Sequence, residues 1–153
     1  MTIAVGETAP NFTLQNTEGN PVELHSYLNG HKGLILFFPL AFTSTCTEEL
    51  CTVRDNMKLY NSLNAKVIAI SVDSFFTLNE FKKAQNLNFT LLSDFNKDVS
   101  EMYGALYKDY FGMQGVSKRA AFVIGEGKEI KYAEVLEDSG KIPSFKSIQK
   151  ALN

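Results

Sequence analysis

The sequence predicts an α/β fold in which helices flank a central mixed β-sheet. Two continuous apolar runs, over residues 33–38 and 67–72, have the β-branched or aromatic content of strands that are covered on both faces. The segment between them has apolar residues at helical spacing, so the three together form a β-α-β unit. Before them, residues 11–14 and 22–24 alternate apolar with polar around a turn at 18–20, which predicts an N-terminal β-hairpin.

The helix between the two central strands is defined by four apolar residues that recur at steps of three and four: Leu50, Val53, Met57 and Tyr60. Such steps keep the side chains on one face of a helix. Thr45 and Glu48 form a candidate capping box at its start, because their spacing lets each side chain bond the other's backbone N–H. One helix that begins near Thr45 is therefore expected.

Five further elements are expected after the second central strand. They are a helix over 77–85, a strand over 89–92, a helix through 99–106, a hairpin of 120–124 with 129–132, and a helix over 143–152. Thr77 and Glu80 form a second candidate capping box, and Pro143 has a favoured first-turn position. Residues 108–118 contain two glycines and show little periodicity, which predicts a loop.

Length and composition limit the class of protein. At 153 residues, with no repeat and no Pro/Gly-rich linker, the chain is expected to form one domain over residues 1–153. The formal net charge of −2 gives no basic surface for nucleic acid. No apolar run reaches the length of a membrane span, and the start of the chain does not resemble a signal peptide. We therefore expect a cytoplasmic protein that binds neither nucleic acid nor membranes.

One thiol, Cys46, lies where the first central strand leads into the helix. In the first helical turn it would meet unpaired backbone N–H groups and the positive end of the helix dipole, and both favour the thiolate over the thiol. It also leads the helical row of Leu50 and Val53, so it is expected to face the sheet. Cys46 is therefore a candidate nucleophile. The alternative is a small buried apolar residue, because free cysteine is often fully buried.

The second thiol, Cys51, shares its helix face with Asp55 and Lys58, nearer the hydrated side. In an intact helix, residues five apart differ in direction by about 140°, and their Cα atoms are about 8.7 Å apart. That distance exceeds the roughly 7 Å limit for a disulfide. A bridge from Cys46 to Cys51 therefore requires the first helical turns to unwind. The alternative is that Cys51 takes no part in the chemistry.

Three further residues are candidates for the same site. Arg119 directly precedes the apolar run 120–124, and a guanidinium near the thiol would stabilise a thiolate and donate to an oxygen on which negative charge develops. Thr43 offers a hydroxyl close to Cys46, and Pro39 would shape the turn because it fixes φ and has no N–H. Taken singly, each of the three could equally be a surface or turn residue.

Two other function classes fit the sequence less well. A thiol-disulfide oxidoreductase of the thioredoxin type would use C-x-x-C, but Glu49 stands three residues after Cys46. A metal-binding domain could combine Cys46 and Cys51 with His25 and His31. Zinc sites, however, usually supply cysteines two to four residues apart and histidines in close pairs. No metal or organic cofactor is therefore expected.

Together, Pro39, Thr43 and Cys46 form the pattern P-x-x-x-T-x-x-C, which resembles the active-site signature of the peroxiredoxins. The resemblance extends to residues 5–14, which look like the opening of that family, and to 116–124, which look like its arginine-bearing strand. It implies a thioredoxin-like fold with an N-terminal hairpin. It also implies a thiol peroxidase that reduces hydrogen peroxide and organic hydroperoxides through a cysteine sulfenic acid.

The resemblance assigns a role to each candidate residue. Cys46 would be the peroxidatic cysteine, Thr43 and Arg119 would activate the thiol and the peroxide, and Pro39 would shield the site. Glu49 matches another frequent family position and would hold Arg119 by a charged hydrogen bond. The sulfenic acid would then condense with a second thiol, and a thioredoxin-like or other thiol reductant would open the disulfide.

Two subfamilies remain open. Cys51 resembles the resolving cysteine of the bacterioferritin-comigratory or Q-type enzymes, whereas residues 38–43 resemble the AhpE-type group, whose members often work with one cysteine and an external thiol. One branch is monomeric and the other dimeric, so both a monomer and a homodimer are expected alternatives. Hydrogen peroxide, alkyl hydroperoxides and peroxynitrite present the same O–O bond to the thiolate, so only the walls of the pocket can distinguish them. Phe42, Tyr110 and Phe111 are candidates for lining the entrance, with packing as the alternative role.

Overall fold

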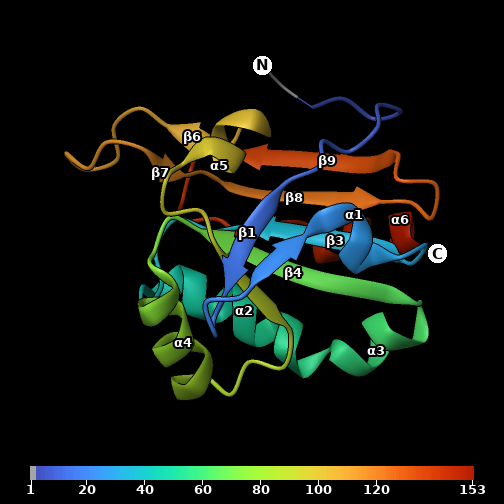
Figure 1. Cartoon of the computed structure of the whole chain (residues 1–153), viewed down its shortest axis with the longest axis horizontal. Coiled ribbons are helices and arrows are strands. Elements are labelled where there is room, and N and C mark those ends of the chain that lie inside the picture. The colour runs from blue at the N-terminus through green and yellow to red at the C-terminus, as the bar shows by residue number, and fades with distance from the viewer. Residues whose placement is uncertain (1–2) are drawn as a thin grey trace.

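A seven-stranded mixed β-sheet forms the centre of the computed structural model, which describes residues 3–153 (Figure 1). Its strand order is β2-β1-β5-β4-β3-β8-β9. In chain order, these strands are β1 (Thr13–Asn16), β2 (Pro21–Glu23), β3 (Lys32–Phe37), β4 (Ala65–Ser71), β5 (Thr90–Ser93), β8 (Arg119–Ile124) and β9 (Ile130–Leu136). A separate antiparallel ribbon pairs β6 (Leu106–Tyr107) with β7 (Val116–Ser117).

The two strands predicted from apolar runs are the central ones. β3 pairs parallel with β4, and β4 pairs parallel with β5. On its other side β3 pairs antiparallel with β8, with Phe37 opposite Ala120. Leu34 and Leu36 of β3 enter the core on one face of the sheet, while Ile35 and Phe37 enter the core on the other. Because strand side chains alternate between faces, both faces must be covered, as predicted.

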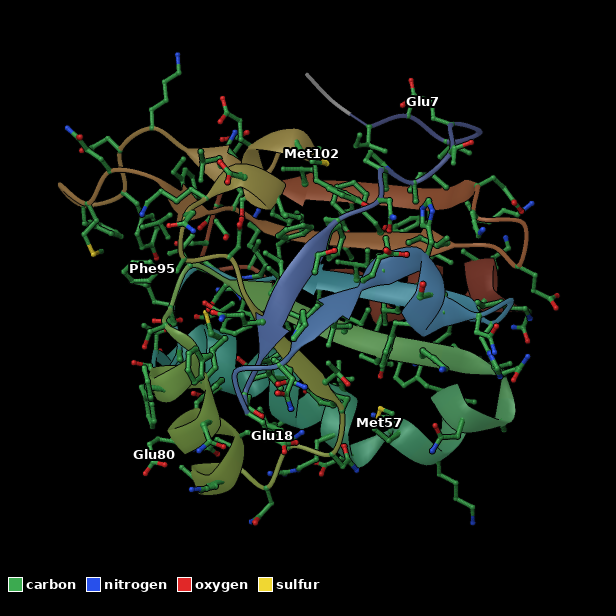
Figure 2. All side chains as sticks on the ribbon, viewed as in Figure 1. Glu7, Glu18, Met57, Glu80, Phe95 and Met102 are labelled. Carbon is green, nitrogen blue, oxygen red and sulfur yellow. The ribbon has the colours of Figure 1, made fainter. Side chains whose placement is uncertain are left out.

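Helices cover both faces of this sheet (Figure 1). They are α1 (Leu24–Leu28), α2 (Ser44–Asp55), α3 (Met57–Ser62), α4 (Phe75–Ala84), α5 (Asp98–Met102) and α6 (Phe145–Leu152). Helices α2, α3, α4 and α6 pack on one face, and α1 and α5 on the other. Charged side chains such as Glu7 and Glu80 point outward at the periphery (Figure 2). None of the helices within residues 3–153 is long and apolar enough to cross a bilayer.

The predicted N-terminal hairpin is confirmed, and it extends the main sheet. β1 and β2 are antiparallel, with Leu14 opposite Val22. Their turn requires a positive φ, which Gly19 adopts at +81° and which glycine tolerates without strain. β1 then pairs with β5, so the hairpin forms one edge of the sheet. The short helix α1, which follows β2 at once, was not predicted.

The helix predicted after β3 is two helices. Asn56 separates α2 from α3, with φ −112° and ψ 12°. Its side-chain Nδ2 donates to the carbonyl of Thr52, while its backbone N–H turns to Val53 at 3.0 Å. The asparagine side chain thus competes with the backbone for a helical acceptor and ends α2. The predicted capping box at Thr45 and Glu48 is wrong, because α2 already begins at Ser44.

Four other predicted boundaries shift. α4 begins at Phe75, two residues early, because the Ser74 hydroxyl accepts from the backbone N–H of Thr77; the capping box at Thr77 and Glu80 is therefore wrong. α5 ends at Met102, before Gly104 adopts φ +69°, so the chain turns into β6. The predicted loop 108–118 ends in β7. α6 is capped by Ser144, so Pro143 precedes the helix instead of starting it.

Candidate active site

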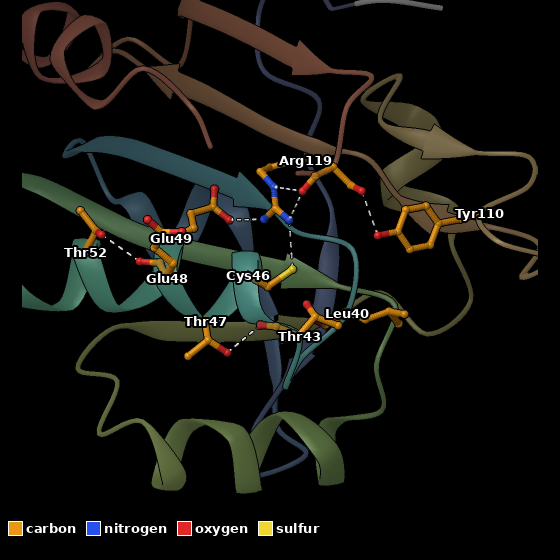
Figure 3. A network of polar contacts seen from close by, with 10 residues as sticks. Leu40, Thr43, Cys46, Thr47, Glu48, Glu49, Thr52, Tyr110 and Arg119 are labelled. Carbon is orange, nitrogen blue, oxygen red and sulfur yellow. Dashed lines mark hydrogen bonds and ion pairs between the residues drawn. The ribbon is translucent and has the colours of Figure 1, made fainter. Parts of the chain in front are cut away.

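Cys46 is the third residue of α2, immediately after the loop that leaves β3 (Figure 3). The prediction that it lies in the first helical turn and faces the sheet is confirmed, because its side chain is fully buried. The buried face of α2 also contains Glu49, Leu50 and Val53. A charged residue on that face requires a partner, since burying an unpaired carboxylate is costly.

Arg119 is that partner, and it contacts Cys46 as well. It is the first residue of β8, and the pairing of β8 with β3 brings it to the end of β3 from which the chain leads to Cys46. Its Nη1 donates to Glu49 Oε1 at 2.7 Å, and its Nη2 donates to Cys46 Sγ at 3.2 Å. Cys46 and Glu49 are three residues apart on one helix face, so one planar guanidinium can reach both.

The two charged groups of this pair are shielded from solvent. Glu49 has no exposed surface and Arg119 has 1%. Burial raises the pKa of the Glu49 carboxyl to about 7, against the attraction of Arg119, which lowers it. Burial acts to lower the pKa of Arg119, but the charges of Glu49 and Cys46 outweigh burial and raise it. The guanidinium therefore stays protonated and supplies a fixed positive charge next to the sulfur.

A backbone carbonyl completes the environment of Arg119. The carbonyl oxygen of Ser139 accepts from Nη2 at 2.9 Å and from Nε at 3.3 Å. All three guanidinium nitrogens are thus engaged, and Nη2 is shared between Ser139 and Cys46 (Figure 3). Ser139 was not predicted from the sequence, because every residue has a backbone carbonyl and this contact does not depend on residue type. The second oxygen of Glu49, Oε2, is buried and accepts no hydrogen bond from residues 3–153.

Thr43 and Pro39 lie on the loop between β3 and α2 that leads to the thiol. Thr43 is the N-cap of α2, and its Oγ1 donates to the carbonyl of Leu40 at 2.7 Å instead of capping the helix. The hydroxyl keeps its lone pairs, so it can still accept a hydrogen bond from a reactant. Pro39 is buried and is separated from the end of β3 only by Phe38. Thr43 precedes Cys46 by three residues and Pro39 precedes it by seven, so both belong to the segment that leads into the first turn of α2.

Asp73 holds this loop and was not predicted. Its Oδ2 accepts from the backbone N–H of Ala41 at 2.8 Å and from the hydroxyl of Ser71 at 2.6 Å. Ser93 in turn donates to the backbone carbonyl of Asp73 at 2.6 Å. A usable signal did exist: Asp73 follows the predicted strand 67–72, and the carboxyl ends of parallel strands gather at one edge of a sheet, where sites form.

Cys51 lies farther along α2 and is directed elsewhere. It is half-buried, and its thiol donates to Oε1 of Gln85, the C-cap of α4, at 3.5 Å. Arg54 fixes the same residue, since its Nη1 donates to the Gln85 carbonyl at 2.7 Å. Both cysteines are free, and an unbroken α2 contains both. The intact helix therefore does not bring Cys46 and Cys51 together.

The remaining candidates lie apart from the thiols or at the surface. The ring nitrogens of His25 and His31 bond backbone carbonyls of Ala9 and Leu28, at 2.8 and 2.9 Å. Residues 3–153 contain no group of three or more His, Cys, Asp and Glu side chains arranged to hold a metal. The three aromatic candidates for the entrance lie on two loops. Phe42, between β3 and α2, is 55% exposed, while half-buried Tyr110 and Phe111, which is 85% exposed, lie between β6 and β7.

The chain is similar in sequence to a known protein family and to individual members of it. Residues 5–133 match the AhpC/TSA family. The chain is 38% identical over 132 residues to Rv2521 of Mycobacterium tuberculosis, a protein assigned as a peroxiredoxin, and the match covers 84% of this chain and 83% of that protein. Peroxiredoxin Bcp of Escherichia coli is 33% identical over 129 residues, with 82% of each chain covered.

A solved structure extends the likeness to the fold. The crystal structure of peroxidoxin BcpB from Mycobacterium tuberculosis superposes with a TM-score of 0.85 at 27% identity, and it covers 98% of this chain and 94% of that chain. The expected thioredoxin-like fold with a mixed central sheet and an N-terminal hairpin is thereby confirmed.

Proposed function

The chain belongs to the AhpC/TSA family and is a peroxiredoxin, an enzyme that reduces peroxides with a thiol, and we propose that Cys46 is the thiol that attacks the peroxide. One observation carries this assignment. The guanidinium of Arg119 donates to Cys46 Sγ while Glu49 holds it in place, in a buried site at the start of a helix. A thiolate is stabilised there by a fixed charge, by the helix dipole and by unpaired N–H groups.

In the peroxidatic step, the Cys46 thiolate attacks one peroxide oxygen in line with the O–O bond. The S–O bond forms as the O–O bond breaks, sulfur is oxidised to the sulfenic acid, and the departing hydroxide or alkoxide takes a proton from water. Arg119 stabilises the charge that develops on the departing oxygen. The Thr43 hydroxyl, whose proton is donated to Leu40, accepts a hydrogen bond from the O–H of the peroxide and orients it. Pro39, which is buried on the loop that leads to Thr43, shields the site from bulk solvent, so the departing group takes its proton after it leaves the site.

We further propose that Cys51 resolves the sulfenic acid. Its thiol condenses with Cys46 sulfenic acid to a disulfide and releases water, and a thioredoxin-like dithiol then opens the disulfide by exchange. The intact α2 forbids that bridge, so its first turns must unwind. Unwinding is favoured because Thr43 makes no side-chain cap and the first turn has no acidic residue.

The AhpE-type alternative, in which an external thiol resolves Cys46, is favoured by the contact of Cys51 with Gln85, which directs this thiol to α4. Both versions use a peroxide and a reducing thiol.

Hydrogen peroxide and organic hydroperoxides are the proposed substrates, and the proposed assembly is either a monomer or a homodimer. The proposal also includes a cytoplasmic location, since two cysteines are too few for a secreted disulfide framework, and one functional domain over residues 1–153.

Stoichiometric oxidation tests the proposal. Reduced protein given one equivalent of hydrogen peroxide should lose both thiols to an internal disulfide. Cys51→Ser should consume the peroxide at an unchanged rate and stop at the sulfenic acid, while Cys46→Ser should consume none. Rapid consumption by Cys46→Ser would remove the assigned nucleophile. Retention of the Cys51 thiol in the oxidised wild-type protein would favour the external thiol.

A further inference from the structure

The irregular segment between β9 and α6 is tied to the neighbouring ribbon of β6 and β7 by the hydroxyl of Tyr110. That hydroxyl donates to Oγ of Ser139 at 3.0 Å. Ser139 is the residue whose carbonyl receives two hydrogen bonds from Arg119. Polar contacts therefore run without interruption from Tyr110 through Ser139 and Arg119 to Cys46 (Figure 3).

We propose that Tyr110 and Ser139 are positioning residues that direct the guanidinium of Arg119 at Cys46. The inference rests on the role proposed above for Arg119. Glu49 fixes one end of the guanidinium through Nη1, which leaves the group free to rotate about that contact. The Ser139 carbonyl fixes the opposite edge through Nη2 and Nε, and only both anchors together define where Nη2 points.

Ser139 itself must be held, because it lies outside any helix or strand. Two contacts from the ribbon and its flanking residue hold this segment at Glu137. Tyr107 Oη donates to the carbonyl of Glu137 at 2.6 Å, and Lys118 Nζ pairs with the Glu137 carboxylate at 2.7 Å. Tyr110 contributes the third contact, which is the one made to Ser139 itself. The position of the carbonyl that Arg119 uses therefore depends on the Tyr110 hydroxyl.

Packing explains the ring of Tyr110 but not its hydroxyl. The ring stacks on Tyr107 with centroids 5.0 Å apart and meets Phe111 edge to face at 4.7 Å. Phenylalanine would make both contacts equally well. The hydroxyl is needed only for its bond to Ser139. Tyr110→Phe thus removes the proposed function and leaves the packing in place.

The experiment measures the second-order rate of Cys46 oxidation by hydrogen peroxide, by rapid quench and mass spectrometry. We expect Tyr110→Phe and Ser139→Ala each to lower the rate about fivefold, because a small misplacement of a catalytic group has a large effect on rate. The double variant should be no slower than either single one, since all three lack the same bond. Ser139→Thr keeps a hydroxyl and should restore the rate. Tyr132→Phe, which removes a hydroxyl bonded to Glu134, is the matched control and should leave the rate unchanged.

Repeating Tyr110→Phe in a protein that already carries Arg119→Lys distinguishes an effect on the position of the guanidinium from a general effect on the fold. Lysine keeps the charge but cannot contact Cys46, Glu49 and Ser139 at once, so Tyr110→Phe should have no further effect there. An effect of equal size in both backgrounds, or unchanged rates in Tyr110→Phe and Ser139→Ala, would overturn the inference. If Arg119→Lys alone leaves the rate unchanged, the proposed function of Arg119 fails instead. If Arg119→Lys does not fold, the other variants test the inference. Ser139→Thr must then be faster than Ser139→Ala, and the double variant must be no slower than either single variant.

Discussion

Arg119 Nη2 lies 3.2 Å from Cys46 Sγ although 73 residues separate the two in sequence. The contact depends on the antiparallel pairing of β8 with β3, which no local pattern in the sequence specifies. It places a permanent positive charge beside the thiol in a site with almost no solvent exposure, where charge interactions are strong.

Arg119→Lys should lower the rate of peroxide reduction about a hundredfold, because a single ammonium cannot donate to Cys46 and to the departing oxygen in the planar geometry of a guanidinium. Stopped-flow measurement of peroxide consumption checks this. Lys131→Gln, which breaks an exposed pair with Glu129, is the control and should have no effect. A rate within threefold of wild type in Arg119→Lys would contradict the role given to the guanidinium.

Glu49→Gln should change how stability depends on pH. The carboxyl pKa is raised from 4.5 to about 7 in the folded protein, so the folded state binds a proton more tightly than the unfolded state. The free energy of unfolding that Glu49 contributes is therefore highest below pH 4.5 and falls as the pH rises to about 7. Between pH 4.5 and about 7, the free energy of unfolding of the wild-type protein should therefore fall by up to ~3 kcal/mol relative to that of Glu49→Gln. Urea unfolding across the pH range measures it, and a constant difference would contradict the raised pKa.

Asp73→Ala should destabilise the protein by about 1–3 kcal/mol, because the N–H of Ala41 and the hydroxyl of Ser71 lose their shared acceptor. It should also slow peroxide reduction, since Ala41 belongs to the loop that carries Thr43. Denaturant unfolding and peroxide kinetics measure the two effects. Asp55→Ala removes a carboxylate from an exposed pair and should change stability by less than ~0.5 kcal/mol. Equal effects of the two substitutions would show that Asp73 does not hold the loop.

Gln85→Leu should speed disulfide formation about two- to fivefold while the first oxidation step keeps its rate. In the variant, the thiol of Cys51 has no acceptor on α4. Cys51 therefore does not have to break a weak neutral hydrogen bond before it moves toward Cys46. Thiol counting after rapid mixing with peroxide separates the two steps. A slower disulfide would mean that Gln85 assists the attack of Cys51 instead of restraining it.

Local patterns in the sequence predicted the central strands, the hairpin and the buried position of Cys46, because each depends on the periodicity of apolar residues around it. Helix boundaries were predicted less well. Asn56 ends α2 by a side-chain bond to Thr52, which the apolar spacing of the helix does not reveal. Ser74 caps α4, although Thr77 looked equally suitable as a cap.

The site was predictable only in part, for a different reason. Cys46, Thr43 and Pro39 are close in sequence, so one motif contains them. Ser139 acts through its backbone carbonyl, which every residue possesses, and only the fold brings it to Arg119. Asp73 had a positional signal at the end of β4, but its bond to Ala41 depends on how the following loop lies beside the one before α2.

The most direct test of the account is to locate the first oxidised sulfur. Reduced Cys51→Ser protein is treated with one equivalent of hydrogen peroxide in the presence of a sulfenic-acid trapping reagent and mapped by peptide mass spectrometry. The account predicts that the trapped adduct lies on Cys46 and accounts for the peroxide consumed. Peroxide consumed at the wild-type rate with no adduct or other oxidation at Cys46 would contradict it.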